Sequence, residues 1–293
     1  MKLILSTILY AYSFVLISQP TISFTFDDGR IYDLGEYSLK EWNDMILSTL
    51  DRHEIKAAFF VRTQGMETKN GRLVLESWNN AGHLLANHTH THPNFNKSEH
   101  SAKSFEWELM KADSILREYS NYEKLFRFPY LKEGNTKEKV DSIRCIMDNH
   151  GFKNGFVTID DADWFVDGQL LKRLKVNANV DLEAYREIYL KHLLERATYY
   201  EKLSYELTSR HIAHTLLLHH NLTSALFLDD LINLFKTNGW KVISAKHAFQ
   251  DPIFDQLPDH TGASLVWDLA QDSGGYTEEA PDSLYYKMEK LGL

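Results

Sequence analysis

Cysteine is scarce in this chain, and a net positive charge, internal repeats and low-complexity segments are absent. Among its 293 residues there is one cysteine, Cys145, which excludes a framework of intrachain disulfides. The formal net charge is −9 and the pI is near 5.9. An acidic chain is a poor candidate for binding nucleic acid, because such proteins gain most of their affinity by neutralising phosphates. The composition therefore indicates an ordinary globular protein that acts on a neutral or small partner.

The chain also lacks an apolar run of full membrane-spanning length. Lys2 precedes an apolar stretch at residues 3–17, which has the length of a signal-peptide core and is short for a membrane span. Ser18 is a small residue at which cleavage could fall, although Pro20 crowds the site and no A-x-A pattern is present. A buried first strand or helix is the alternative. We predict that residues 1–18 are a signal peptide or membrane anchor and that the protein is exported, whether secreted, periplasmic or membrane-anchored.

Short β-rich runs alternate with helical patterns over the next 220 residues or so. This alternation predicts a parallel α/β architecture, either a barrel or an open sheet, with active-site residues directly after the strands. Residues 167–210 are charged and read as mostly helical, and residues 251–293, rich in glycine and proline, read as a loosely structured C-terminal extension. The predicted strands cover residues 21–26, 56–61, 83–87, 124–129, 153–160, 214–220 and 240–244.

Two histidines follow the third predicted strand, within NHTHTHPNF at residues 87–95. His88 and His92 are four residues apart, so on a helical turn they share one face and can chelate one cation. A run of exposed histidines is the alternative for such a pair alone. Asp28, after the first strand, would complete a facial set of two histidines and one carboxylate that leaves positions open for water and substrate. The sequence thus predicts a divalent-metal site.

Two adjacent carboxylates end the first predicted strand, in TFDDG. Within a strand Asp27 and Asp28 would face opposite ways, but at a strand end that turns at Gly29 both can reach one cleft. If Asp28 binds a metal, Asp27 is free to act as a base on water whose pKa the metal lowers. The alternative is a turn or N-cap pair, because Asp-Gly is a common turn signal.

Five motifs occur in one order along the chain, each after a predicted strand: TFDDG, H-T-x-x-H, R-x-P-Y, D-x-x-D-W and L-x-H. This set resembles the polysaccharide deacetylases, the NodB-homology group of carbohydrate esterase family 4, over roughly residues 21–250. The resemblance implies a distorted (β/α) barrel of seven strands. It also implies a divalent metal, commonly zinc with cobalt or nickel as alternatives, and hydrolysis of N- or O-acetyl groups on a glycan with release of acetate.

The first three motifs contain the residues that, by the resemblance, bind the metal and act as the general base. Asp27 matches the general base, and Arg127 matches the arginine that holds it. Asp28, His88 and His92 match the metal ligands. The domain is accordingly expected over residues 19–250, with a helical insertion at about 167–210.

The remaining positions concern the acid and the substrate groove. His219 matches the general acid that protonates the leaving group, and Asp163 matches the carboxylate that tunes it. Tyr130 matches the residue whose backbone N–H helps to bind the oxyanion, and Trp164 matches an aromatic that lines the groove.

Neighbouring polar residues are expected to have other roles. His220 adjoins His219, but strand alternation sends it to the opposite face. Asp160 and Asp161 read as loop or N-cap groups, and His83 and His90 have no direct role in the expected site.

Departures from the family pattern leave the glycan open. The third motif continues as RFPYLKEG where P-P-Y-G is common, Leu84 stands where an acidic residue is usual, and the segment 165–211 is longer than its counterpart. None of these removes a catalytic group. Two other functions remain: a cell-wall glycan-binding barrel without turnover, and a metalloesterase of small acetylated molecules.

Overall fold

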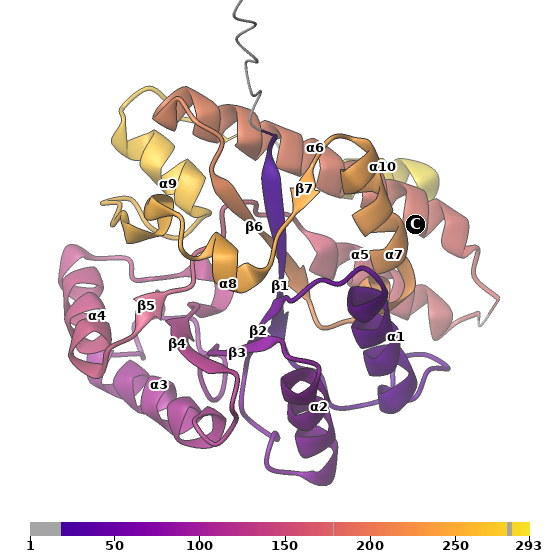
Figure 1. Cartoon of the computed structure of the whole chain (residues 1–293), viewed down its shortest axis with the longest axis horizontal. Helices are drawn as coiled ribbons and strands as arrows, with labels where there is room; N and C mark the ends of the chain where they lie inside the picture. Colours follow the sequence, from indigo (N-terminus) through magenta and orange to yellow (C-terminus); the bar gives the residue numbers. More distant parts are fainter. Residues whose placement is uncertain (1–18, 178, 280–282) are drawn as a thin grey trace, which may run out of the picture.

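Seven parallel strands form one curved sheet at the centre of the molecule (Figure 1). The computed structural model describes residues 19–177, 179–279 and 283–293, so the predicted signal or anchor at 1–18 lies outside the described residues. The sheet order is β5-β4-β3-β2-β1-β6, and β7 pairs with the start of β1. The strands are β1 (Thr21–Asp28), β2 (Ala58–Val61), β3 (Leu84–Asn87), β4 (Tyr122–Phe126), β5 (Lys153–Asn154), β6 (Ala213–His219) and β7 (Lys241–Val242).

The sheet closes on itself through the chain that follows β5. β5 pairs with β4, and a few residues later Ile159 forms a parallel bridge with Leu216 of β6. Leu217 donates its N–H to the Ile159 carbonyl over 3.1 Å, which extends this contact. The expected distorted (β/α)7 barrel is therefore confirmed, with its fifth strand reduced to short pieces.

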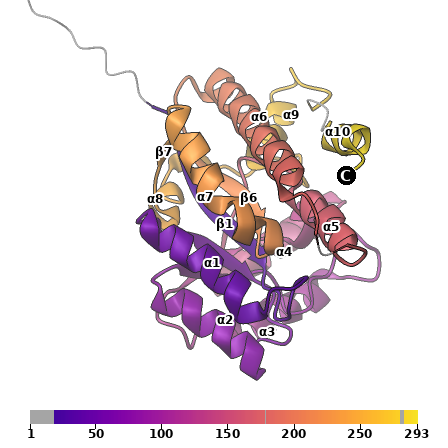
Figure 2. The same ribbon diagram turned by 90° about the vertical axis from the view of Figure 1, so that its right-hand side faces the viewer.

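Helices cover the outer face of the sheet. Successive side chains of a strand point alternately inward and outward, and the outward side chains of β1 are apolar and pack on these helices. Phe24 and Phe26 of β1 point outward to Phe235 and Trp78, with ring centroids 6.2 and 5.3 Å apart. Figure 2 shows α1, α7 and α6 side by side over this face. The helices are α1 (Leu39–Arg52), α2 (Lys69–Asn80), α3 (Ala102–Leu116), α4 (Lys137–His150), α5 (Asp163–Leu174), α6 (Leu182–Thr208), α7 (Leu222–Thr237), α8 (Ala245–Ala248), α9 (Leu265–Asp272) and α10 (Leu284–Leu291), with 3-10 turns η1 (Pro129–Leu131) and η2 (Pro252–Asp255).

The stretch at 167–210, predicted to be mostly helical, contains most of α5 and all of α6. α6 has 27 residues and carries many charges. Throughout the described part of the chain, no helix combines the length and apolar character needed to cross a membrane.

The C-terminal extension differs from its predicted loose structure. It contains η2, α9 and α10, and Leu265, Trp267 and Met288 are buried in the main hydrophobic core. The prediction was wrong because α9 and α10 have only eight residues each. Their apolar stripes are short, so the surrounding glycines and prolines dominated the sequence pattern. The division of the chain at residue 250 stays a prediction.

Candidate active site

The two carboxylates at the end of β1 reach the same side of the barrel because the backbone turns between them. Asp27 continues the strand, points inward and is 3% exposed. Asp28 has φ +79° and Gly29 has φ +91°, so the alternation of the strand ends at Asp28. The positive φ favours glycine at position 29, and a Cβ there would lie 2.5 Å from Cε of Met66 and 3.1 Å from Cζ of Phe59, so a buried side chain would also have to shift.

Arg127 lies behind Asp27 and fixes its carboxylate. Its Nη1 donates to Oδ1 of Asp27 over 2.6 Å and to Oγ1 of Thr25 over 2.9 Å, and its Nε donates to the Gly155 carbonyl over 2.8 Å. The guanidinium also stacks on Phe60, 3.8 Å from the ring centroid. The side chain is almost wholly buried, so this arrangement is rigid.

Asp28, His88 and His92 form a group that can hold a metal ion. One ligand atom from each residue lies within 4.8 Å of the others. Nε2 of His92 is 3.3 Å and Nε2 of His88 is 3.9 Å from Oδ1 of Asp28. The Nδ1–H of His88 donates to the Arg127 carbonyl over 2.8 Å, which leaves Nε2 free to coordinate a cation. Two imidazoles and a carboxylate around one point fit a divalent transition metal.

The geometry that brings the two histidines together is not the predicted helical turn. Residues 88–92 form an irregular loop in which Thr89 and His92 have φ +69° and +65°. Glu108 of α3 holds this loop by accepting hydrogen bonds from the N–H groups of His90 and Thr91. The sequence analysis missed Glu108, although a charged residue on the buried face of a helix is a recognisable signal.

His219 and Asp163 form a second ion pair beside the carboxylates. His219 is the register partner of Asp27 on the neighbouring strand β6. Its Nδ1–H donates to Oδ1 of Asp163 over 2.5 Å, and its backbone N–H donates to Oδ2 over 2.9 Å. Asn221, also missed from sequence, donates to the same Oδ2 over 3.1 Å.

The pKa values of these groups shift in different directions. Burial lowers the pKa of His88 and of His92 to about 4, so both are neutral near pH 7, as metal ligands must be. Burial opposes the charging of His219, but the Asp163 carboxylate outweighs it and raises the pKa of His219 to about 10. Burial also raises the pKa of Asp27 against the effect of Arg127.

Asp28 differs from Asp27 in the sign of its shift. Burial favours its neutral form, but the charge of His219, joined in acid by those of protonated His88 and His92, outweighs burial and lowers the pKa of Asp28. The pKa values of the two adjacent carboxylates therefore shift in opposite directions. This difference would suit one carboxylate to accept a proton and the other to stay ionised as a ligand.

The expected groove residues lie at the rim of the site. Tyr130 is exposed in η1 with φ +59°, and its ring packs against His92 with centroids 4.7 Å apart. The turn uses the N–H groups of Leu131 and Lys132 for its own hydrogen bonds. Trp164 is 54% exposed in the first turn of α5, directly after Asp163.

The neighbouring polar residues lie apart from the metal group. His220 is buried against Trp42, 4.2 Å between ring centroids, on the outer face of the sheet as predicted. His83 accepts from the Ala57 N–H, and His90 contacts the Thr63 hydroxyl.

Asp161 acts as a turn group, since its Oδ1 accepts from the Asp163 N–H at the start of α5. Asp160 bonds through its carbonyl to Nε of Arg196.

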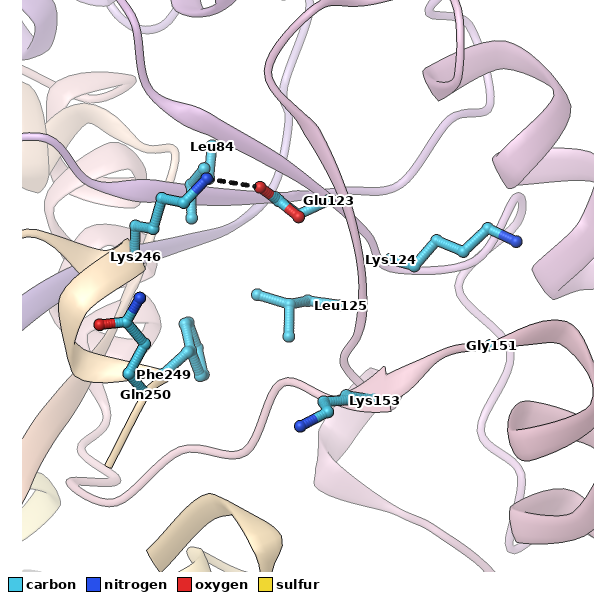
Figure 3. A pocket seen from close by; sticks show the side chains of 9 residues that line it. All are labelled: Leu84, Glu123, Lys124, Leu125, Gly151, Lys153, Lys246, Phe249 and Gln250. Atoms are coloured by element: carbon cyan, nitrogen blue, oxygen red, sulfur yellow. Dashed lines mark hydrogen bonds and ion pairs between the residues drawn. The ribbon is translucent and has the colours of Figure 1, made fainter. Parts of the chain in front are cut away.

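A surface cavity of about 320 Å³ lies at the opposite, amino end of β3, β4 and β5 (Figure 3). Leu125 and Phe249 point into it, and Lys246 pairs with Glu123 over 2.9 Å at its edge. None of the predicted site residues lines this cavity; they follow the carboxyl ends of the strands instead.

Comparisons with known proteins agree with the first three motifs. A family model for polysaccharide deacetylase matches residues 17–153, which include Asp27 and Tyr130 but end before Asp163 and His219. The peptidoglycan-N-acetylglucosamine deacetylase of Bacillus cereus is 32% identical over 123 residues. That match covers 41% of this chain and only 40% of the relative.

Solved structures share the fold at low identity. A family 4 carbohydrate esterase pseudoenzyme from Bacillus anthracis aligns with a TM-score of 0.55 and 19% identity, covering 78% of this chain and 65% of that one. The chitin deacetylase of Colletotrichum lindemuthianum aligns with a TM-score of 0.52 and 18% identity, covering 79% and 88%. The match to the polysaccharide deacetylase family therefore covers residues 17–153, which is slightly less than half of the chain.

Proposed function

We propose that this protein is a metal-dependent hydrolase that removes N- or O-acetyl groups from a glycan and releases acetate. The observation that carries the proposal is the convergence of three pairs at one end of the barrel. Asp27 is paired with Arg127, Asp28 lies within reach of two histidine nitrogens, and Asp163 is paired with His219. A protein that only binds glycan has no need for a matched base and acid beside a ligand set.

The base side of the reaction belongs to Asp27. A divalent cation held by Asp28, His88 and His92 would polarise the acetyl carbonyl and lower the pKa of the attacking water. The inward-facing Asp27 carboxylate accepts the proton of that water, and its bond to Arg127 keeps it aimed at the cleft. The raised pKa of Asp27 suits a group that must take up a proton.

The acid side of the reaction belongs to His219. With its pKa raised to about 10, the imidazole is protonated near pH 7 and can donate its Nε2 proton to the departing nitrogen or oxygen. Asp163 fixes the ring through Nδ1, which leaves Nε2 directed away from that pair. The N–H of Tyr130 is the proposed donor to the oxygen of the tetrahedral intermediate.

Substrate, metal and location form part of the same proposal. The relative's name points to N-acetylated cell-wall glycan, and the two-histidine, one-carboxylate set points to zinc, with cobalt or nickel as alternatives. Export through residues 1–18, with cleavage or membrane anchoring there, would bring the protein to such a substrate.

Acetate release from a panel of acetylated glycans tests this function. The full-length chain should release acetate from at least one polymer when loaded with zinc, and a chelator should abolish the release. Glycan binding without acetate release under any metal would favour the binding-barrel alternative. Turnover of small acetylated esters alone would favour the metalloesterase.

A further inference from the structure

A row of three aromatic side chains leads away from the Asp163–His219 pair, called the acid pair below, toward the C-terminal helix α10. Trp164 directly follows Asp163, and its ring centroid lies 5.9 Å from that of Phe165. The Phe165 ring lies 5.7 Å from that of Tyr285 on α10. Two of the three are widely exposed: Trp164 is 54% and Tyr285 64% accessible. Phe165 is half-buried against the hydrophobic core, so the exposed rings of Trp164 and Tyr285 are joined through a partly covered ring.

The surface at Tyr285 is held by a firmly packed helix. Leu284 and Met288 of α10 are each 1% exposed, and Lys287 pairs with Glu195 of α6 over 2.6 Å. Arg173 of α5 also donates to the Gly292 carbonyl at the end of α10. An aromatic ring displayed on a fixed helix loses little conformational freedom when a ligand packs on it.

Sugar rings are ligands of suitable chemistry for such a row. A pyranose has a flat face of C–H groups that packs on an aromatic ring, while its hydroxyl groups stay in water at the edge. Contiguous exposed apolar surface rimmed by polar groups is a feature of ligand-binding grooves. We propose that Phe165 and Tyr285 form an extended subsite, continuous with Trp164, for pyranose rings of the glycan chain beyond the residue that is deacetylated.

This inference rests on the proposed function and sharpens it, because it requires a polymeric substrate. A small acetylated molecule would reach the acid pair without contacting Tyr285. The aromatic row should therefore increase the binding affinity only for long oligosaccharides.

The test compares Tyr285→Ala with a matched neighbour, Tyr286→Ala. Tyr286 is on the same helix and 55% exposed, but Lys290 lies over its ring at 4.5 Å and it makes no part of the row. Zinc-loaded full-length variants are assayed for KM and kcat with a short and a long N-acetylglucosamine oligomer. Binding of both oligomers is measured by calorimetry in an Asp27→Asn background, so the two readouts are independent.

Tyr285→Ala should bind the long oligomer roughly tenfold more weakly, with a matching rise in KM, the size expected when one partly buried aromatic contact is lost. Its kcat and its affinity for the short oligomer should not change, and Tyr285→Phe, which keeps the ring, should behave as wild type. Unchanged affinity in Tyr285→Ala, or an equal loss in Tyr286→Ala, would overturn the proposal. So would a wild-type chain that binds both oligomers equally. Binding that depends on Tyr285 without acetate release would reject the proposed function and keep the subsite.

Discussion

At the scale of single residues, the site depends on a change of backbone direction at Asp28. Asp27 keeps the inward orientation of the strand and bonds to Arg127, whereas the positive φ of Asp28 turns its carboxylate toward His88 and His92. Like charges in adjacent positions normally oppose each other. Of these two carboxylates, Arg127 bonds to Asp27 alone and His92 pairs with Asp28 alone, while Nε2 of His88 lies 3.6 Å from Asp27 and 3.9 Å from Asp28, so the two carboxylates have different surroundings.

Gly29→Ala should disturb this arrangement. The substitution places a Cβ in the left-handed region and 2.5 Å from Met66 Cε, which should cost about 1–3 kcal/mol of stability and weaken zinc binding through Asp28. Gly151→Ala is the control, because Gly151 has φ +73° but no atom within 4 Å of an added Cβ. Thermal unfolding and zinc calorimetry give the comparison. Identical behaviour of the two variants would show that the space around Gly29 has no effect.

The ion pair between His219 and Asp163 predicts how the stability of the protein depends on pH. The folded-state His219 pKa of about 10 lies above the ordinary value of 6.5, so protonated His219 stabilises the metal-free protein fully below pH 6.5. That contribution should disappear as the pH rises from 6.5 through 10. The difference in urea midpoint between wild type and His219→Gln, measured with chelator present, should shrink over this range. A constant difference would contradict the Asp163–His219 pair.

At the scale of elements, α6 and the C-terminal extension meet at the loop that contains Asp160 and leads into Asp163 at the start of α5. Arg196 of α6 donates to the Asp160 carbonyl over 3.0 Å and pairs with Glu279 of the extension. The hydroxyl of Tyr200 donates to the same carboxylate over 2.5 Å. These contacts join three chain segments behind the acid pair.

Arg196→Met should therefore lower the free energy of unfolding by about 2 kcal/mol, because it removes charge-assisted hydrogen bonds from a buried site. Arg186→Met on the same helix should change stability little, since its ion pairs with Glu183 and Asp230 lie at the surface, where the side chains are 33%, 55% and 44% exposed. Urea unfolding of both variants measures the difference. Equal losses would mean that the contact with Asp160 and Glu279 adds no stability.

At the scale of the whole molecule, the C-terminal extension is part of the folded unit. Leu265, Trp267 and Met288 are buried together with the barrel's helices. A chain that ends at residue 250 should therefore lose cooperative unfolding and expose apolar surface, as seen by near-ultraviolet circular dichroism and dye binding. A truncated chain with a native spectrum and a sharp transition would show that the extension is dispensable.

The sequence predicted the alternation of strands and helices because that pattern is local. It also selected Asp28, His88 and His92, although their convergence depends on left-handed residues in a loop rather than on the expected helical turn. The packing of α9 and α10, and the row that reaches Tyr285, depend on contacts between distant segments. The hydrophobic pattern of an eight-residue helix spans about two turns, which is too short to show which distant segment the helix packs against.

The central claim is that Asp27 is the base of a metal-dependent deacetylation while Asp28 binds the metal. Acetate release by zinc-loaded Asp27→Asn, with the bound zinc quantified in the same sample, tests it most directly. We predict wild-type zinc content and a loss of acetate release of at least roughly a hundredfold, the contribution typical of a general base. Acetate release at the wild-type rate from Asp27→Asn with zinc bound would contradict the account.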